Sequence, residues 1–288
     1  MTFSIVARDA ETGAFGVGVE THRPSVGGIV PWVKPGVGAI ATQSFANINF
    51  GPQGLALLEE GLPAERTLAA LIAGDDLPTR RQVAVLDETG TPAVHTGDDC
   101  IPFAGHVIGE GYSCQANMMM NAGVPEAMAA AFERATGHLA ERIMSALEAA
   151  QAAGGDIRGM MSAAILVSEP GPRSSTWDLR IDNSPRPLEE LRALLNVRLA
   201  GIMVSDEHIK PEMSLEEAMA AFERAAVLDP NDELRFWFGV NMLTGMGHVD
   251  EAVRLLEPLF ERAPNWAELL RRLTLPGAKV LQPRFGMT

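Results

Sequence analysis

Residues 2–20, TFSIVARDAETGAFGVGVE, decide the fold class of this chain. Residues 3–8 and 14–20 are two β-type runs, and the segment 9–13 between them is rich in Asp and Gly, as hairpin turns are. Valine and glycine alternate in the second run, and glycine in a strand often marks the close approach of another layer or a ligand. The chain is therefore predicted to open with an antiparallel hairpin.

The same hairpin signal recurs along the first 200 residues. Further strand pairs are predicted at 28–33 and 37–43, 82–87 and 93–96, 102–108 and 111–116, and 161–167 and 177–181. Helices are predicted at 53–60, 64–73, 125–136, 138–152 and 188–199. Hairpins build antiparallel sheets, and the paired helices need an apolar sheet face to cover. We therefore predict an α+β domain over residues 1–202, a four-layer αββα sandwich with two facing sheets and helices outside both.

A different pattern begins after about residue 203. One pattern occurs twice, 34 residues apart: an alanine, a large apolar residue, a small or apolar residue, and then a proline. The first copy is Ala218, Phe222, Ala225 and Pro230, and the second is Ala252, Leu256, Leu259 and Pro264. This is the tetratricopeptide period, so residues 203–273 are predicted to form a small all-α repeat segment, with an irregular tail at 274–288. Only about two repeats fit, and short arrays need support. We therefore expect this segment to pack on the main domain or on a second chain, either in a homo-oligomer or with a protein partner through 203–273.

Composition excludes several classes of function. The net charge is −14, and an acidic chain repels phosphate backbones, so no nucleic-acid binding is expected. No run of 18 apolar residues and no signal peptide is seen, which predicts a cytoplasmic protein without a membrane span. Cys100 and Cys114 lack a CxxC partner, and the histidines lack metal-ligand spacing, so we expect neither a metal nor a cofactor.

Thr2 is the first candidate for catalysis. Methionine before a small residue is the usual substrate of methionine aminopeptidase, and removal of Met1 would give Thr2 a free α-amine. The pKa of such an amine is about 7.7–8.0, so one residue would supply both a hydroxyl nucleophile and its own general base. The simpler interpretation is an ordinary strand-forming threonine. If Met1 is retained, the amine becomes an amide and the mechanism fails.

The stretch 42–51 places amides and hydroxyls on a loop before a helix. Gln43 and Asn47 are candidate donors to a developing oxyanion, and Thr42 is a candidate substrate ligand. Helix capping and turn formation by Asn47 are the alternative.

Other polar residues are candidates for substrate binding. His95, Thr96 and Cys100 follow a predicted strand, and Gln115 and Asn117 share one face of another strand. That face either meets water or lines a polar pocket. The pair Asp156 and Arg158 either binds a charged substrate group or forms a structural ion pair.

Several of these stretches together resemble a known bacterial family. They are Thr2–Asp9, Gly36–Gln43 with Phe45–Asn47, Arg81–Val83, His95–Gly97 with Cys100, Ala104–His106, Gln115 with Asn117, Gly154–Asp156 with Arg158–Gly159, Ser162–Ala163, and Asp178–Arg180. In this order they are similar to the family called domain of unknown function 1028, over roughly residues 1–200. That family is placed with the N-terminal-nucleophile hydrolases and also occurs with an added C-terminal module.

The resemblance implies hydrolysis of an amide bond by the residue that starts the first strand, here Thr2. Proteasome-like relatives add a lysine beside the nucleophile, and Lys34 does not match that position. The chain also departs from the family at Thr21–Pro24 and at Met160–Met161.

The leading hypothesis is an amidohydrolase that cleaves a small amide or related C–N bond in a small-molecule substrate. The alternative is a non-catalytic relative that binds a small molecule or a protein through the helical segment. A third option keeps hydrolysis but uses Cys100 or Ser4 as the nucleophile.

Overall fold

The computed structural model describes residues 2–171, 176–205 and 208–287. The chain forms two units, Met1–Ala193 and Leu194–Thr288. Met1, whose removal the catalytic hypothesis requires, lies outside the described residues.

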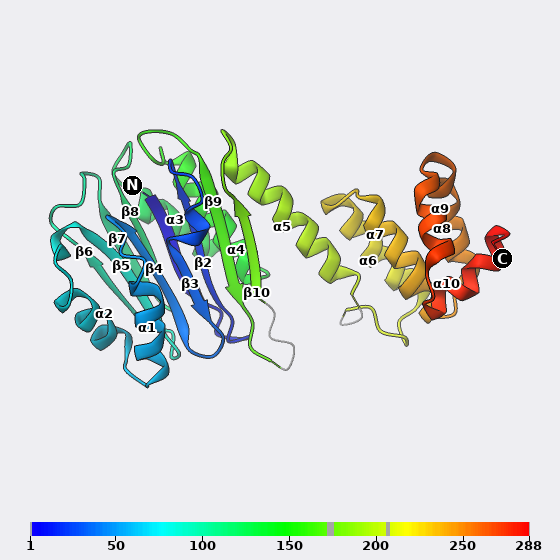
Figure 1. Cartoon of the computed structure of the whole chain (residues 1–288), viewed down its shortest axis with the longest axis horizontal. Coiled ribbons are helices and arrows are strands. Elements are labelled where there is room, and N and C mark those ends of the chain that lie inside the picture. The colour runs from blue at the N-terminus through cyan, green and yellow to red at the C-terminus, as the bar shows by residue number, and fades with distance from the viewer. Residues whose placement is uncertain (1, 172–175, 206–207, 288) are drawn as a thin grey trace. The chain divides into compact units, whose positions relative to one another are not determined.

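Six antiparallel strands form the larger sheet of the first unit, in the order β10-β9-β2-β1-β8-β7 (Figure 1). Its strands are β1 (Thr2–Arg8), β2 (Phe15–Thr21), β7 (Gly105–Gly109), β8 (Tyr112–Asn117), β9 (Ser162–Ser168) and β10 (Thr176–Ile181). The hairpin predicted from residues 2–20 is present, with Phe3 opposite Glu20 and Arg8 opposite Phe15. Because β1 and β2 lie inside the sheet and both faces are covered, nearly every residue in them is buried.

Four antiparallel strands form the smaller sheet, in the order β3-β4-β5-β6. They are β3 (Pro31–Lys34), β4 (Gly38–Ser44), β5 (Arg81–Asp87) and β6 (Pro92–Thr96). The strand predicted at 28–33 begins only at Pro31, because residues before it form the 3-10 helix η1 (Val26–Gly28). The strand predicted at 102–108 begins at Gly105, because Phe103 takes a left-handed φ of 55° that interrupts extended backbone.

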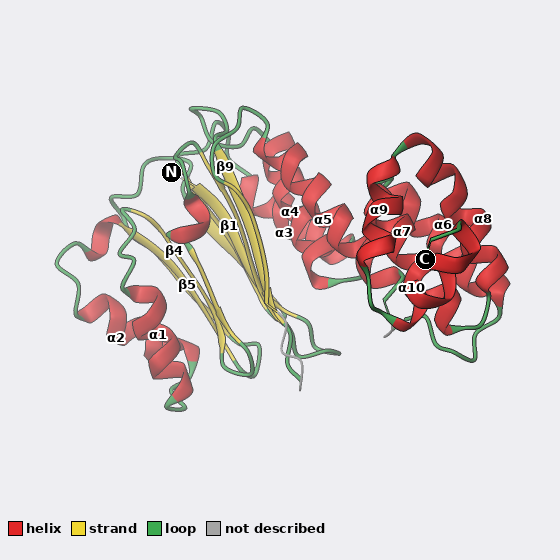
Figure 2. Cartoon of the chain, turned by 45° about the vertical axis from the view of Figure 1, so that its right-hand side comes forward, coloured by secondary structure: helices red, strands yellow, loops and turns green. Residues whose placement is uncertain are grey.

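Helices cover the outer faces of the two sheets (Figure 2). Helices α1 (Phe50–Glu59) and α2 (Ala64–Ala73) pack on the smaller sheet, and a short 3-10 helix, η2 (Pro78–Arg80), leads into β5. Helices α3 (Val124–Arg134) and α4 (Leu139–Ala152) pack on the larger sheet. Between the sheets lies an apolar core that includes Val6, Val17, Ala41 and Ala84.

The alternation of valine and glycine in β2 has a packing cause. A Cβ atom added to Gly16 or Gly18 would lie 2.5 Å or 2.3 Å from the Ile143 side chain of α4. Only glycine lets the helix approach the sheet this closely, as the sequence pattern predicted.

The second unit is helical. Helix α5 (Pro187–Met203) begins in the first unit and ends in the second, and is followed by α6 (Leu215–Leu228), α7 (Asp232–Trp237), the π-helical segment η3 (Phe238–Leu243), α8 (Val249–Arg262), α9 (Pro264–Arg272), α10 (Pro276–Leu281) and the 3-10 helix η4 (Gln282–Phe285). All six recurring apolar positions are buried in its core: Ala218, Phe222, Ala225, Ala252, Leu256 and Leu259.

The prediction of an irregular tail at 274–288 is wrong, because residues 276–285 form α10 and η4. Pro276 and Pro283 suggested loop, but each occupies a first helical turn, where a missing N–H costs nothing. Ala278 and Leu281 of α10 are fully buried. The tail is therefore part of the core of this unit.

Candidate active site

Thr2 starts β1 at the end of the two sheets where β2, β4 and β8 finish. Its side chain is 95% buried, and its hydroxyl donates a hydrogen bond to the hydroxyl of Thr21, with 3.2 Å between the two oxygens. Its carbonyl accepts hydrogen bonds from the Gln43 and Asn117 side-chain amides at 3.3 and 3.4 Å. The first residue of the strand is thus held from both sheets.

A pocket of about 440 Å³ opens beside Thr2. Its walls come from the end of β2 and the loop after it, the end of β4 and the loop after it, the start of β5, and the segment before β9. The described residues that line it are Thr2, Thr21, His22, Arg23, Pro24, Val26, Ile29, Val30, Gln43, Ser44, Phe45, Ala46, Arg81, Arg158 and Met161. The lining therefore combines a hydroxyl nucleophile candidate, several apolar residues and three arginines.

A buried network of amides fixes the position of Thr2. At its centre lies Gln82 of β5, whose Oε1 accepts from Gln43 Nε2 at 2.7 Å and from Asn117 Nδ2 at 2.9 Å. Gln82 Nε2 donates to Thr96 Oγ1 and to the carbonyls of residues 105 and 116. Because Gln82, Gln43 and Asn117 are essentially inaccessible to water, their hydrogen bonds must be made within the protein.

The polar face of β8 belongs to the same interior. Gln115 Nε2 donates to Ser4 Oγ at 2.7 Å, and Ser113 Oγ donates to Gln115 Oε1 at 3.1 Å. Gln115 and Asn117 neither face water nor line the pocket, which were the two alternatives that alternation on the strand suggested. Ser4 is fully buried as well, so its hydroxyl cannot meet a substrate.

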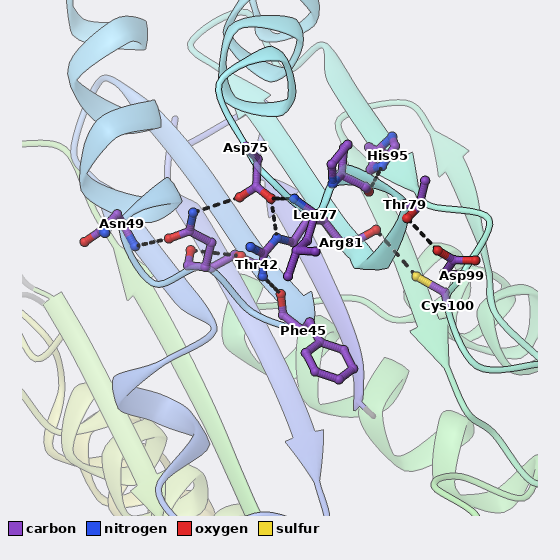
Figure 3. A network of polar contacts seen from close by, with 12 residues as sticks. Thr42, Phe45, Asn49, Asp75, Leu77, Thr79, Arg81, His95, Asp99 and Cys100 are labelled. Atoms are coloured by element: carbon purple, nitrogen blue, oxygen red, sulfur yellow. Dashed lines mark hydrogen bonds and ion pairs between the residues drawn. The ribbon is translucent and has the colours of Figure 1, made fainter.

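The loop after β4 is hydrogen-bonded to both members of an ion pair between Arg81 of β5 and Asp75, which follows α2 (Figure 3). Arg81 Nε donates to Asp75 Oδ1 at 2.9 Å, and Arg81 Nη1 donates to the carbonyl of Phe45. Asp75 also accepts from the Asn47 side chain at 3.0 Å. The Asp75 carboxylate is 2% exposed, and although burial raises its pKa, hydrogen bonds from Arg81 and Asn47 outweigh that effect and lower it.

This anchoring separates the residues predicted for the loop. Gln43 lines the pocket, whereas the side chain of Asn47 is turned to Asp75 and its carbonyl accepts from Thr42 Oγ1 at 3.2 Å. Asn47 and Thr42 are absent from the described pocket lining.

His95, Thr96 and Cys100 lie on β6 and in the turn after it. His95 Nε2 bonds the carbonyl of Pro78, and Thr96 Oγ1 bonds His106 Nδ1. The Cys100 thiol donates to the carbonyl of Arg81 at 3.5 Å. These residues contact the strand that carries Arg81 rather than the pocket itself.

Asp156 and Arg158 form an ion pair at the pocket rim. Arg158 donates from Nε and Nη2 to the two carboxylate oxygens at 3.0 and 2.7 Å. The Asp156 carboxylate has no exposed surface, and it also accepts from the backbone N–H of His22. The structural interpretation of this pair is therefore confirmed, and because Arg158 also lines the pocket, binding of a charged substrate group stays a prediction.

Glu20 is a buried carboxyl that sequence reasoning did not single out. It belongs to β2, directly before Thr21, and has no exposed surface. Burial, together with the negative charge of Asp156, raises its pKa to about 9. Glu20 is therefore protonated at neutral pH and adds no negative charge beside the pocket.

Sequence reasoning also gave no role to Arg81 or Arg23, although both line the pocket. Both arginines lie beside the ends of predicted strands, and this position was the only hint in the sequence that they could line a site. Lys34 pairs with Glu59 on the surface and does not contribute to the described lining, in agreement with the mismatch noted from the sequence. Within the described residues, no group of three or more His, Cys, Asp or Glu side chains could hold a metal ion.

The architecture is that of a mixed α/β protein with antiparallel sheets and a helical C-terminal region. The chain belongs to the family of unknown function DUF1028, whose model matches residues 2–191, so the family resemblance seen in the sequence is confirmed. Protein SPO2555 from Silicibacter pomeroyi, which carries the same family model, has a similar crystal structure. The two share 32% identity with a TM-score of 0.64, over 69% of this chain and 86% of that one.

No curated protein shows significant similarity to the chain. In the part of the chain that the structure describes, no helix is both long and apolar enough to cross a membrane.

Proposed function

We propose that the first unit is a four-layer αββα sandwich of the N-terminal-nucleophile hydrolase type and that it cleaves a small amide or related C–N bond. One observation carries the proposal: Thr2 starts a central strand and is one of the residues that line the arginine-lined pocket. The facing sheets with outer helices support the fold assignment.

The reaction begins once Met1 has been removed. The Thr2 α-amine takes the hydroxyl proton, the Oγ1 atom bonds the substrate carbonyl carbon, and the proton passes to the leaving nitrogen as the C–N bond breaks. Water then hydrolyses the resulting ester and restores the threonine. The hydrogen bonds from Gln43 and Asn117 to the Thr2 carbonyl hold the nucleophile at the start of this sequence.

The loop 42–47 supplies the oxyanion site in this proposal. Gln43 and residues 44–46 line the pocket beside Thr2. Asn47 and Thr42 support the loop from behind through Asp75 and through their mutual hydrogen bond. Cys100, Thr96 and His95 act in the same indirect way on β5 and β6, and Gln115 acts through Ser4.

Two measurements on protein expressed without an N-terminal tag test the proposal. Intact mass should show loss of one methionine. Hydrolysis of a panel of N-acyl amino acids, followed by the release of primary amine, should fall by about a thousandfold or more in Thr2→Ala, because both the nucleophile and its hydrogen bond are lost.

Thr136→Ala is the matched control, because this exposed threonine lies in the turn between α3 and α4. It should keep full activity, and Thr2→Ser should keep part of it. Retention of Met1, or full activity of Thr2→Ala, would overturn the hydrolase proposal. The non-catalytic binding relative would then be the better interpretation, with the tetratricopeptide-like helices of the second unit as the interaction segment.

A further inference from the structure

We propose that the pocket beside Thr2 binds a substrate carboxylate through Arg23, Arg81 and Arg158, so that the preferred ligands are small acylated amino acids or related acids. The description of this ligand as a substrate rests on the proposed function. The anion site itself rests only on the pocket and its charges.

Charge is segregated at this pocket. Three arginines and a histidine line it, and no Asp or Glu is among its described lining residues. The whole chain carries a net charge of −14, so a cationic concavity runs against its overall composition. A pocket wall of one sign concentrates ligands of the opposite sign.

Two of the arginines are held from behind by buried carboxylates. Asp75 is 2% exposed and Asp156 is 0% exposed, while their partners Arg81 and Arg158 are 12% and 32% exposed. In each ion pair, the carboxylate is therefore buried in the protein, and the arginine lines the pocket. Such pairs fix the direction of the guanidinium groups, which match the planar fork of a carboxylate.

Arg23 supplies the excess positive charge. It lies in the loop after β2, where its carbonyl accepts a hydrogen bond from Ser162 Oγ at 2.5 Å. Among the described residues, no ion pair to the Arg23 side chain is found, and the residue is exposed at the pocket rim. Its charge is therefore not neutralised by a carboxylate of the residues that the structure describes.

The size of the pocket limits the ligand. A volume of about 440 Å³ lies at the lower end of the range for small-molecule sites, which hold a ligand of modest size. Thr2 and the arginines share this space, so the carboxylate and the scissile bond belong to the same small molecule.

Binding to the Thr2→Ala protein tests the anion site without turnover. N-acetylglycine is the carboxylate probe, N-acetylglycinamide its uncharged analogue, and inorganic phosphate the competing anion, each measured by isothermal titration calorimetry at low ionic strength. We expect N-acetylglycine to bind at least tenfold more tightly than either of the other two, and to bind more weakly as NaCl is added.

Arg23→Gln should weaken N-acetylglycine binding about fivefold to tenfold, and Arg23→Glu should abolish it. Arg66→Gln, an exposed arginine on α2 outside the pocket, is the matched control and should bind as the parent does. These positions avoid the buried pairs, whose disruption would leave Asp75 or Asp156 without a partner.

Equal binding of the uncharged amide, tighter binding of phosphate, or unchanged affinity in Arg23→Glu would each overturn the carboxylate site. Failure of the hydrolase proposal looks different: N-acetylglycine would still bind in an Arg23-dependent way, but no N-acyl amino acid would be cleaved by the wild-type protein.

Discussion

The two ends of the central strands carry two pockets of opposite character. The pocket at the Thr2 end measures about 440 Å³ and is lined by arginines without carboxylates. The pocket at the Arg8 end is larger, about 740 Å³, and is lined by hairpin turns that carry both signs of charge. The same strands thus have a pocket lined by positive charge at one end and a pocket lined by both positive and negative charge at the other.

Both signs of charge are found among the described lining residues of the Arg8 end: two arginines, Arg8 and Arg142, and three acidic residues, Asp9, Glu11 and Glu110. Arg142 lies 3.8 Å from the Asp9 carboxylate and stacks over the Phe132 ring, with its guanidinium carbon 4.3 Å from the ring centroid. We therefore choose the Thr2 pocket as the candidate site because of its nucleophile candidate and its single sign of charge, and not because of its volume.

Substitutions at the two ends of β5 test this contrast between the Thr2 end and the Arg8 end, and they should give the largest change in stability. Gln82→Ala should destabilise the protein by about 3 kcal/mol, because it removes the acceptor that Gln43 and Asn117 share and the donor to Thr96 Oγ1 and to the carbonyls of residues 105 and 116. Urea denaturation measures this loss.

Asp87→Ala is the matched change at the other end of the same strand. Asp87 accepts hydrogen bonds from Ala64 N–H and from the Thr89 and Thr91 backbone, and its loss should cost about 1–2 kcal/mol. Equal losses at both ends would contradict the special role of the amide network.

Glu20 gives the Thr2 end its own pH dependence. Its pKa is raised from 4.5 to about 9, so the folded state keeps a proton that the unfolded state loses above pH 4.5. This contribution to stability is complete below pH 4.5 and is lost as the pH rises toward 9. Between pH 6 and pH 8, wild type should lose about 2.7 kcal/mol relative to Glu20→Gln, which is two pH units at about 1.36 kcal/mol each.

Urea denaturation of both proteins at the two pH values gives this difference directly. A change in the free energy of unfolding that Glu20→Gln causes equally at both pH values cancels in this comparison. Parallel stability curves for wild type and Glu20→Gln would show that Glu20 is ionised in the folded protein. Asp87 should behave in the opposite sense: burial opposes its ionisation, but hydrogen bonds from Thr89, Ala64 and Thr91 lower its pKa, so its contribution is lost as the pH falls.

Packing between β2 and α4 should give the smallest effect. Gly18→Ala places a methyl group 2.3 Å from Ile143, so the helix or that side chain must shift, at a cost of about 1–2 kcal/mol. Thermal unfolding measures the change. Gly105→Ala is the control, because nothing lies within 4 Å of its added methyl group, and comparable losses in the two variants would point to backbone effects instead of packing.

Much of the fold follows from local signals in the sequence. Hairpin turns such as 9–13 and the Val-Gly alternation of β2 identify strands, and the paired helices require sheet faces to cover. The tail shows where such signals fail, because Pro276 and Pro283 are typical both of loops and of first helical turns. Only the packing of Ala278 and Leu281 into the core decides between the two.

The candidate site was only partly within reach of the sequence. Thr2, Gln43 and Arg158 line one pocket as candidates, whereas Gln115 and Asn117 are buried. Alternation on a strand reports which side chains share a face, but it does not report what covers that face. The stacking of the second sheet turns the polar row of β8 into an interior network.

The sequence by itself determined the order of strands and helices over the first 200 residues, the place of Thr2 at the start of a strand, and the spacing of the C-terminal repeat, because these depend on neighbours along the chain. The tertiary structure alone decided that Arg23, Arg81 and Arg158 meet at Thr2. These residues lie far apart in the sequence, and they converge because facing sheets bring the ends of β2 and β4, the start of β5 and the approach to β9 to one edge.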